Sequence, residues 1–115
     1  MRSHDFYFKE VPAKGRLPQR RHSHTLTACP KERCLILIGG KSESGVFLRD
    51  VCLFRLPTST WETCAIADNP FDNGIAGHCA DAWDNCIFVF GGITNEGFRM
   101  PGITYFTFAK SQLAS

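Results

Sequence analysis

The chain has 115 residues, and its 43% of hydrophobic and 21% of charged residues are typical of an ordinary globular protein. A formal net charge of +2 is too small to indicate binding to nucleic acid or to a membrane surface. No apolar run approaches the roughly 20 residues that cross a bilayer, and the first residues form no secretory signal, so we expect a cytoplasmic or nuclear protein.

Short apolar runs separated by turn residues recur along the whole chain, and none of them has the period of a helix. This spacing is typical of an all-β protein. Adjacent runs that are joined by short turns should form antiparallel hairpins. In chain order, we expect strands over residues 6–11, 24–28, 34–38, 51–56, 61–66, 77–82, 86–90 and 103–108.

Two copies of one sequence motif, an apolar run followed by a pair of glycines, lie 52 residues apart. One copy runs from Cys34 to Gly40 and the other from Cys86 to Gly92. The similarity continues without a gap on the C-terminal side, and a period of about 50 residues indicates a repeat architecture. The unit that repeats has four predicted antiparallel strands, which is the composition of one β-propeller blade.

The second strand of each copy is apolar at every position, over Leu35–Ile38 in the first copy and Ile87–Phe90 in the second. Continuous apolar character predicts burial on both faces of the strand. Such a strand fits the middle of a blade that has a neighbouring blade on each side. The glycine pair can then end the strand with a sharp exit, because glycine tolerates positive φ and close approach of other backbone.

The spacing of the motif residues resembles the kelch repeat, which has Pro-x-x-Arg-x-x-His, an apolar strand, Gly-Gly, a loop, Asp, an aromatic residue and Trp. In the first copy, Phe54 stands where the family usually has Tyr. The second copy is degenerate, with Ile75, Gly102 and Leu113 at the positions of Arg, Asp and Trp. The residues that match are Pro18, Arg21, His24, Gly39, Gly40, Asp50, Phe54 and Trp61 in the first copy, and Gly77, His78, Gly91, Gly92 and Phe106 in the second.

The segment Phe8–Val11 also resembles Trp61–Cys64, so it looks like the last strand of a preceding blade. The resemblance thus divides the chain into a last strand plus linker (residues 1–17), a first kelch repeat (residues 18–66) and a second, incomplete one (residues 67–115). Kelch propellers close with more blades than the two that this chain accounts for. We therefore expect an all-β, partial kelch-type β-propeller with four-stranded antiparallel blades and no closed ring, as a fragment of a longer propeller protein.

The residue pattern gives little support to catalysis or metal binding. No Cys-x-x-Cys spacing occurs, whereas a structural zinc site needs four converging ligands. His78 and Cys79 are adjacent in a predicted strand, so their side chains point to opposite faces and are poorly placed as a catalytic dyad. We expect no enzyme activity, no metal and no cofactor, and we expect the six cysteines to be reduced and mostly to serve as small core residues.

The resemblance implies a non-catalytic module for protein–protein interaction, with a protein partner that the sequence does not identify. In such a blade, the loop between the second and third strands lies at the same end as the loop that links consecutive blades. We call this end the loop face; it should carry residues 13–20, 41–49, 67–74 and 93–101. Aromatic, Met and Arg side chains are frequent in binding hot spots. The predicted contact residues are Phe47, Leu48, Phe71, Phe98, Arg99 and Met100.

Two alternatives stay open at this point. The chain could be an accessory propeller part of a larger enzyme, such as a methyltransferase or a ubiquitin-ligase substrate receptor, or a truncated product without a stable fold. Two blades share one interface and leave two faces bare, so the chain is also expected to self-associate through apolar surface. The residues expected on the bare faces are Ile36, Ile38, Phe88 and Phe90.

Overall fold

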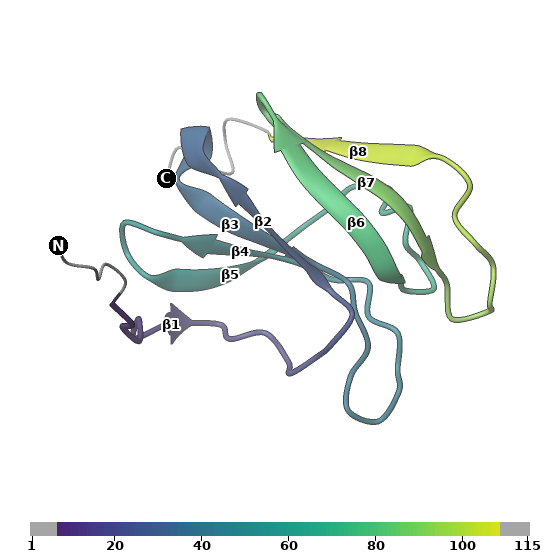
Figure 1. Ribbon diagram of the computed structural model, residues 1–115, viewed down its shortest axis with the longest axis horizontal. Helices are drawn as coiled ribbons and strands as arrows, with labels where there is room; N and C mark the ends of the chain where they lie inside the picture. Colours follow the sequence, from purple (N-terminus) through teal and green to yellow (C-terminus); the bar gives the residue numbers. More distant parts are fainter. Residues whose placement is uncertain (1–6, 109–115) are drawn as a thin grey trace, which may run out of the picture.

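The computed structural model describes residues 7–108, which form two sheets packed against each other, antiparallel except for the short β1 (Figure 1). The strands β2, β3, β4 and β5 make the first unit, blade 1, and β6, β7 and β8 make the second, blade 2. The bounds are β1 (Lys14–Gly15), β2 (Thr25–Cys29), η1 (Pro30–Glu32), β3 (Cys34–Ile38), β4 (Val51–Arg55), β5 (Thr60–Cys64), β6 (Ala76–Trp83), β7 (Cys86–Ile93) and β8 (Ile103–Thr107).

Blade 1 has the predicted strand order. β3 pairs antiparallel with β2 on one side and with β4 on the other, and β4 pairs with β5. The turn between β2 and β3 is the single 3-10 turn η1, which Arg33 closes in the left-handed conformation at a φ of 57°. The prediction that residues 34–38 form the middle of a blade is therefore confirmed.

Blade 2 repeats this arrangement with three strands. β7 lies between β6 and β8 and pairs antiparallel with both. It continues through the glycine pair to Ile93, three residues further than the predicted strand. Within residues 7–108, no strand pairs with the outer edge of β8, so this edge is open in the described part of the chain.

The N-terminal segment differs from the sequence prediction. A strand was expected over Phe6–Val11, but residues 7–11 form none, and Phe6 lies outside the described residues. Instead, the two residues of β1 pair in parallel with β5, at the outer edge of blade 1. The physical reason is that a strand needs a partner edge, and Figure 1 shows β1 and the open edge of β8 on opposite sides of the molecule.

The main core lies between the two blades. Because side chains alternate along a strand, each blade has two faces. The face of blade 1 toward blade 2 carries Ile36, Ile38 and Leu53, and we call it the forward face. The face of blade 2 toward blade 1 carries Ile87, Val89 and Phe106, and we call it the backward face.

This alternation corrects one expectation about bare surface. Ile36 and Ile38 were expected to be exposed, but they are 3% and 0% exposed because they lie on the forward face of blade 1, inside the interface. Phe90 belongs to the outer face of blade 2 and is 55% exposed, as expected for a face without a neighbour. Across residues 7–108, no helix is long and apolar enough to span a bilayer.

Candidate functional site

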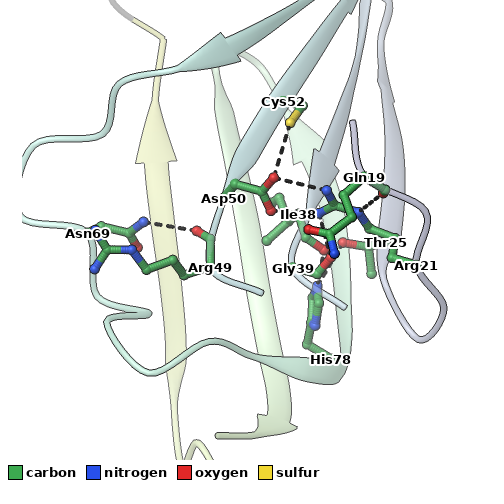
Figure 2. Close-up of polar contacts among 10 residues, drawn as sticks. All are labelled: Gln19, Arg21, Thr25, Ile38, Gly39, Arg49, Asp50, Cys52, Asn69 and His78. Atoms are coloured by element: carbon green, nitrogen blue, oxygen red, sulfur yellow. Dashed lines mark hydrogen bonds and ion pairs between the residues drawn. The ribbon is translucent and has the colours of Figure 1, made fainter. Parts of the chain in front are cut away.

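An ion pair between Arg21 and Asp50 fixes the two loop segments that enter blade 1. The Arg21 guanidinium donates to both carboxylate oxygens of Asp50, from Nη1 to Oδ1 at 2.6 Å and from Nη2 to Oδ2 at 2.9 Å (Figure 2). Nη1 also donates to the Gly39 carbonyl at 3.0 Å. The contacts tie the segment before β2 to the end of β3 and the start of β4, so they set the position of the loops between these strands.

Burial and pairing act in opposite directions on Asp50. Burial raises its pKa, but the hydrogen bonds and the charge of Arg21 outweigh this effect, so the pKa of Asp50 lies below its ordinary value. The Arg21 side chain is itself 3% exposed. A charge that is so deeply buried needs its partner, and the pair is therefore a structural anchor.

His78 joins the two blades. It is a buried residue of β6, and its Nε2 lies 3.0 Å from the Ile38 carbonyl oxygen in β3 and 3.0 Å from the Thr25 hydroxyl in β2 (Figure 2). A carbonyl can only accept, so Nε2 carries the proton and donates it to Ile38. Burial lowers the pKa of His78, opposed by the hydrogen bond to Ile38. The contact links blade 2 to the end of the central strand of blade 1.

Three loops meet at the end of the blades where β3 and β7 finish. The Ile75 amide donates to the Leu48 carbonyl at 3.1 Å. The Asn69 side chain donates to the Arg49 carbonyl at 3.0 Å (Figure 2). The Asn73 side chain donates to Glu96 at 3.0 Å. The loops of residues 41–49, 67–74 and 93–101 therefore form one continuous loop face.

A shallow hollow of about 290 Å³ opens on the loop face, near the starts of the innermost strands β2 and β6. Its wall combines apolar surface, backbone and two basic side chains. The Lys41 ammonium lies over the Phe47 ring at 4.8 Å from the ring centre, a cation–π contact that holds both side chains against the hollow. The lining residues are Ser23, Lys41, Phe47, Ala76, Gly77, Gly92, Ile93 and Arg99.

The charge of this hollow is positive. Lys41 and Arg99 line it, and no acidic residue is part of its described lining. The backbone holds both basic residues in place, since Lys41 bridges His22 and Phe47, and Arg99 bridges Ile93. Because the backbone at these two positions is already fixed, less conformational entropy is lost there when a ligand binds. The hollow can therefore accept a negatively charged group beside an apolar one.

Groups that could perform other chemistry are scattered. In the part of the chain that the structure describes, no three His, Cys, Asp or Glu side chains gather as a metal site would require. The six cysteines are all free thiols, of which Cys79 is exposed and Cys29, Cys34 and Cys52 are buried. Burial raises the pKa of Cys52 and of Cys64 to about 11.

The repeat pattern, the blade topology and the motif contacts agree with a comparison against protein families. The model of the KLHDC2/KLHL20/DRC7 Kelch-repeats domain matches residues 2–114. The chain belongs to the kelch-repeat family. A search of the curated proteins found no match. Kelch-repeat domains are in general non-catalytic folds that mediate protein–protein interaction.

The two kelch repeats use the same position in different ways. Arg21 in the first repeat pairs with Asp50, whereas Ile75 stands at the Arg position of the second repeat and is fully buried. Ile75 packs into the core between the blades, close to Gly39. The degenerate second repeat has thus replaced an ion pair by apolar packing.

The structure separates the predicted contact residues into two groups. Phe98 is 67% exposed and Arg99 is exposed, as a binding surface requires. Phe71 was predicted to contact a partner, but it is 2% exposed and its ring packs edge-on against that of Phe106, with 5.7 Å between the ring centres. Met100 is partly buried against the same core. Phe71 is therefore a core residue.

Phe47 and Leu48 are both half-buried. Phe47 lines the hollow, whereas the backbone of Leu48 holds the loops together through its contacts with Gly40 and Ile75. Sequence reasoning missed Lys41 and Ile93 as lining residues. Each directly follows a glycine pair, and this position in both repeats was the available signal. The residue after the pair lies beside the starts of the innermost strands.

A second cavity, of about 270 Å³, lies between the outer parts of the two blades. Its walls come from β3, β4 and β5 of blade 1 and from β7 and β8 of blade 2, and they are mainly apolar. The lining residues are Ile36, Val51, Leu53, Glu62, Thr63, Cys64, Ala65, Ile66, Ile87, Phe106, Thr107 and Phe108. This cavity borders the open edge of β8.

Proposed function

We propose that this kelch-repeat chain is a non-catalytic module that binds a segment of a partner protein in the hollow of the loop face. The observation that carries the proposal is the composition of this hollow, in which Lys41 and Arg99 flank apolar surface from Phe47 and Ile93. Basic side chains next to an aromatic ring favour a partner segment with an acidic side chain beside an apolar one.

The exposed rim extends the same surface. Phe98 and Val46 are 67% and 56% exposed on the two loops beside the hollow. Aromatic and apolar side chains on loops that a rigid sheet positions are typical of binding sites. Met100 and Phe71 contribute indirectly, since they hold the loops to the core.

The test is selection from a displayed library of random peptides on the wild-type chain, followed by affinity measurement of the selected peptides. We expect peptides enriched in Asp or Glu next to an apolar residue. The double variant Lys41→Glu/Arg99→Glu should raise their dissociation constants about tenfold or more, because each factor of ten needs only about 1.4 kcal/mol.

The matched control is Lys31→Glu, which reverses an exposed basic side chain that pairs with Asp84 at the opposite end of the blades. This variant should keep the affinity of the wild-type chain. Peptides that bind the Lys41→Glu/Arg99→Glu variant normally, or that lose affinity on Lys31→Glu, would place the binding surface elsewhere and overturn the proposal.

A further inference from the structure

Within residues 7–108, no element covers the outer face of blade 2, which points away from blade 1 and is mainly apolar. Phe90, Ile103 and Tyr105 on this face are 55%, 65% and 61% exposed, and the rings of Phe88 and Tyr105 lie 5.6 Å apart. The residues of the face, which we call the forward face of blade 2, form three cross-strand rows: Cys79, Phe90 and Ile103; Asp81, Phe88 and Tyr105; and Trp83, Cys86 and Thr107. Asp81 is the one charged side chain in these rows.

This bare face has a buried counterpart inside the same chain. Phe90 stands at the repeat position of Ile38, and Tyr105 stands at that of Leu53. Ile38 and Leu53 are 0% and 3% exposed, because the forward face of blade 1 packs against the backward face of blade 2. The described part of the chain therefore leaves exposed one half of an interface of the kind that it forms between blades 1 and 2.

The complementary half is the backward face of blade 1, on the other side of the molecule. On this face Leu26 of β2 and Leu56, which follows β4, are 52% and 48% exposed. Its middle is covered within the chain, since Leu37, Cys52 and Phe54 are 6%, 2% and 7% exposed. Neither half can reach the other within one chain while blade 2 covers the forward face of blade 1. A second copy, in contrast, can bring the exposed part of its backward face, with Leu26 and Leu56, onto the first copy.

The open edge of β8 offers a second junction. An unpaired edge strand presents a row of free backbone groups that can pair with another strand. Next to it lies the 270 Å³ apolar cavity between the blades, with Phe106 in its wall. In blade 1 the equivalent edge is covered by β5, and the ring of Trp61 lies 5.0 Å from that of Phe54.

The exposed segment Phe8–Val11 fits this edge in sequence and register. It resembles Trp61–Cys64 of β5, and Phe8 and Val11 are 100% and 60% exposed. β5 pairs Trp61 with Phe54 and Cys64 with Val51. The same register on β8 places Phe8 opposite Phe106 and Val11 opposite Ile103, with Phe8 on the side of the cavity.

The length of the connection agrees with this placement. Twelve residues lie between Val11 and His24, and thirteen lie between Cys64 and His78, the equivalent positions in the link between blades 1 and 2. The pairing of β1 with β5 must open, which breaks the hydrogen bonds from the Lys14 amide to Ser59 and from the Arg16 amide to Trp61. In their place, residues 8–11 form a four-residue strand on β8 of the other copy, and a face of blade 1 becomes buried.

We propose that copies of this chain assemble head to tail, with blade 1 and residues 8–11 of one copy completing blade 2 of the next. The contact is heterologous, because two different faces meet, so it closes into a ring if the rotation per copy allows it. Since propellers close with about four to eight blades, rings of about two to four copies are expected.

The test is a mixing experiment with two single variants, read by analytical ultracentrifugation. Phe90→Arg places a charge on the forward face of blade 2, and Leu26→Arg places one on the backward face of blade 1. Each variant alone should dissociate, with a dissociation constant about tenfold or more above that of the wild-type chain. Mixed in equal amounts, they should form a dimer, because each supplies the intact face that the other lacks.

A symmetric dimer, in which the forward faces of blade 2 from two copies meet, predicts a different result in the mixing experiment. Phe90→Arg would dissociate the chain, and the Leu26→Arg variant would associate by itself without any gain from mixing. That result, or a wild-type chain that stays monomeric at every concentration, would overturn the proposal. Val46→Arg, at an equally exposed apolar residue on the loop face, is the matched control and should associate like the wild-type chain.

The strand junction is tested separately with Phe8→Asp/Val11→Asp, two changes at exposed positions that cannot unfold the core. This variant should weaken association by about tenfold or more. If association stays unchanged, residues 8–11 do not pair with the edge of β8, and the strand-exchange part is wrong. The loop-face variant Lys41→Glu/Arg99→Glu should associate normally, so failure of the peptide-binding proposal and failure of this one are distinguishable.

Discussion

Arg21 and Asp50 form a two-point ion pair in which the cation is 97% buried and the carboxylate is partly open to solvent, with side-chain exposures of 3% and 36%. This asymmetry decides what each substitution does. Removal of the acid leaves a buried guanidinium without its counter-charge, and such a charge is costly. The pair holds three segments of blade 1 together, because Arg21 also donates to Gly39.

Asp50→Asn should therefore lower the free energy of unfolding by about 2–4 kcal/mol. The measurement is urea unfolding at a concentration where the chain is monomeric. Asp84→Asn is the matched control, since it removes an exposed ion pair with Lys31 whose side chains are 61% and 69% exposed. Such a surface pair contributes about 0–1 kcal/mol. Equal losses in the two variants would contradict the anchoring role of Arg21.

The glycine pairs allow a second comparison at equivalent repeat positions. Gly39 has a φ of 62°, and an added Cβ would lie 2.5 Å from the Ile75 carbonyl oxygen. Gly91 has a φ of 75°, but an added Cβ there would meet nothing within 4 Å. Gly39→Ala should therefore destabilise the chain by strain plus steric clash, whereas Gly91→Ala carries only the strain, about 1–2 kcal/mol. Equal stability losses in urea unfolding would contradict the close approach of the linker to β3.

The burial of His78 predicts a pH dependence of stability. Because the folded state lowers the pKa of His78, the unfolded chain binds a proton at a higher pH than the folded chain does. Stability is then complete above the ordinary pKa of histidine, about 6.5, and declines as the pH falls below it. His78→Gln keeps a donor for the Ile38 carbonyl but cannot take up a proton. The variant should show a flatter stability profile between about pH 7 and pH 5, and an unchanged slope would contradict this role of His78.

The thiols should differ sharply in reactivity, because the thiolate is the reactive form. Cys79 is exposed, whereas Cys29, Cys34 and Cys52 are buried, and Cys64 has a pKa of about 11. Cys86 is half-buried, so in dilute native protein at pH 8 a disulfide reagent should give its fastest phase with Cys79, and Cys79→Ser should remove that phase. A fast phase that persists in this variant would mean that one of the other thiols is more open than the structure shows.

The blade could be predicted from the sequence where pattern and topology coincide. The continuous apolar run of β3 has the predicted bounds, because such a run is typical of a strand that is covered on both faces. The N-terminal segment shows the limit of this reasoning. Residues 8–11 have the pattern of a strand, but a pattern cannot supply the edge that the strand needs, and the described chain leaves them unpaired with any strand.

The candidate site was predicted less completely, for a reason that Phe71 illustrates. An aromatic residue on a loop can point to solvent or into the core, and the sequence does not give its direction. Here the Asn69 side chain accepts from the Phe71 amide at 2.9 Å and donates to the Arg49 carbonyl, which fixes a turn that directs the ring inward. The hollow itself depends on three loops that meet in space, so Lys41 and Ile93 become recognisable as its lining only in the fold.

The described part of one chain leaves the forward face of blade 2 bare, and in the proposed assembly a second copy covers it. Cys79 lies on this face, next to Phe90 in the sheet. The rate at which a thiol reagent labels Cys79 therefore shows directly whether a second copy covers the face. The decisive measurement is this rate as a function of protein concentration, in the wild-type chain and in Phe90→Arg. We predict that the rate falls as the wild-type concentration rises and stays high in the variant. A wild-type rate that is independent of concentration would contradict the claim.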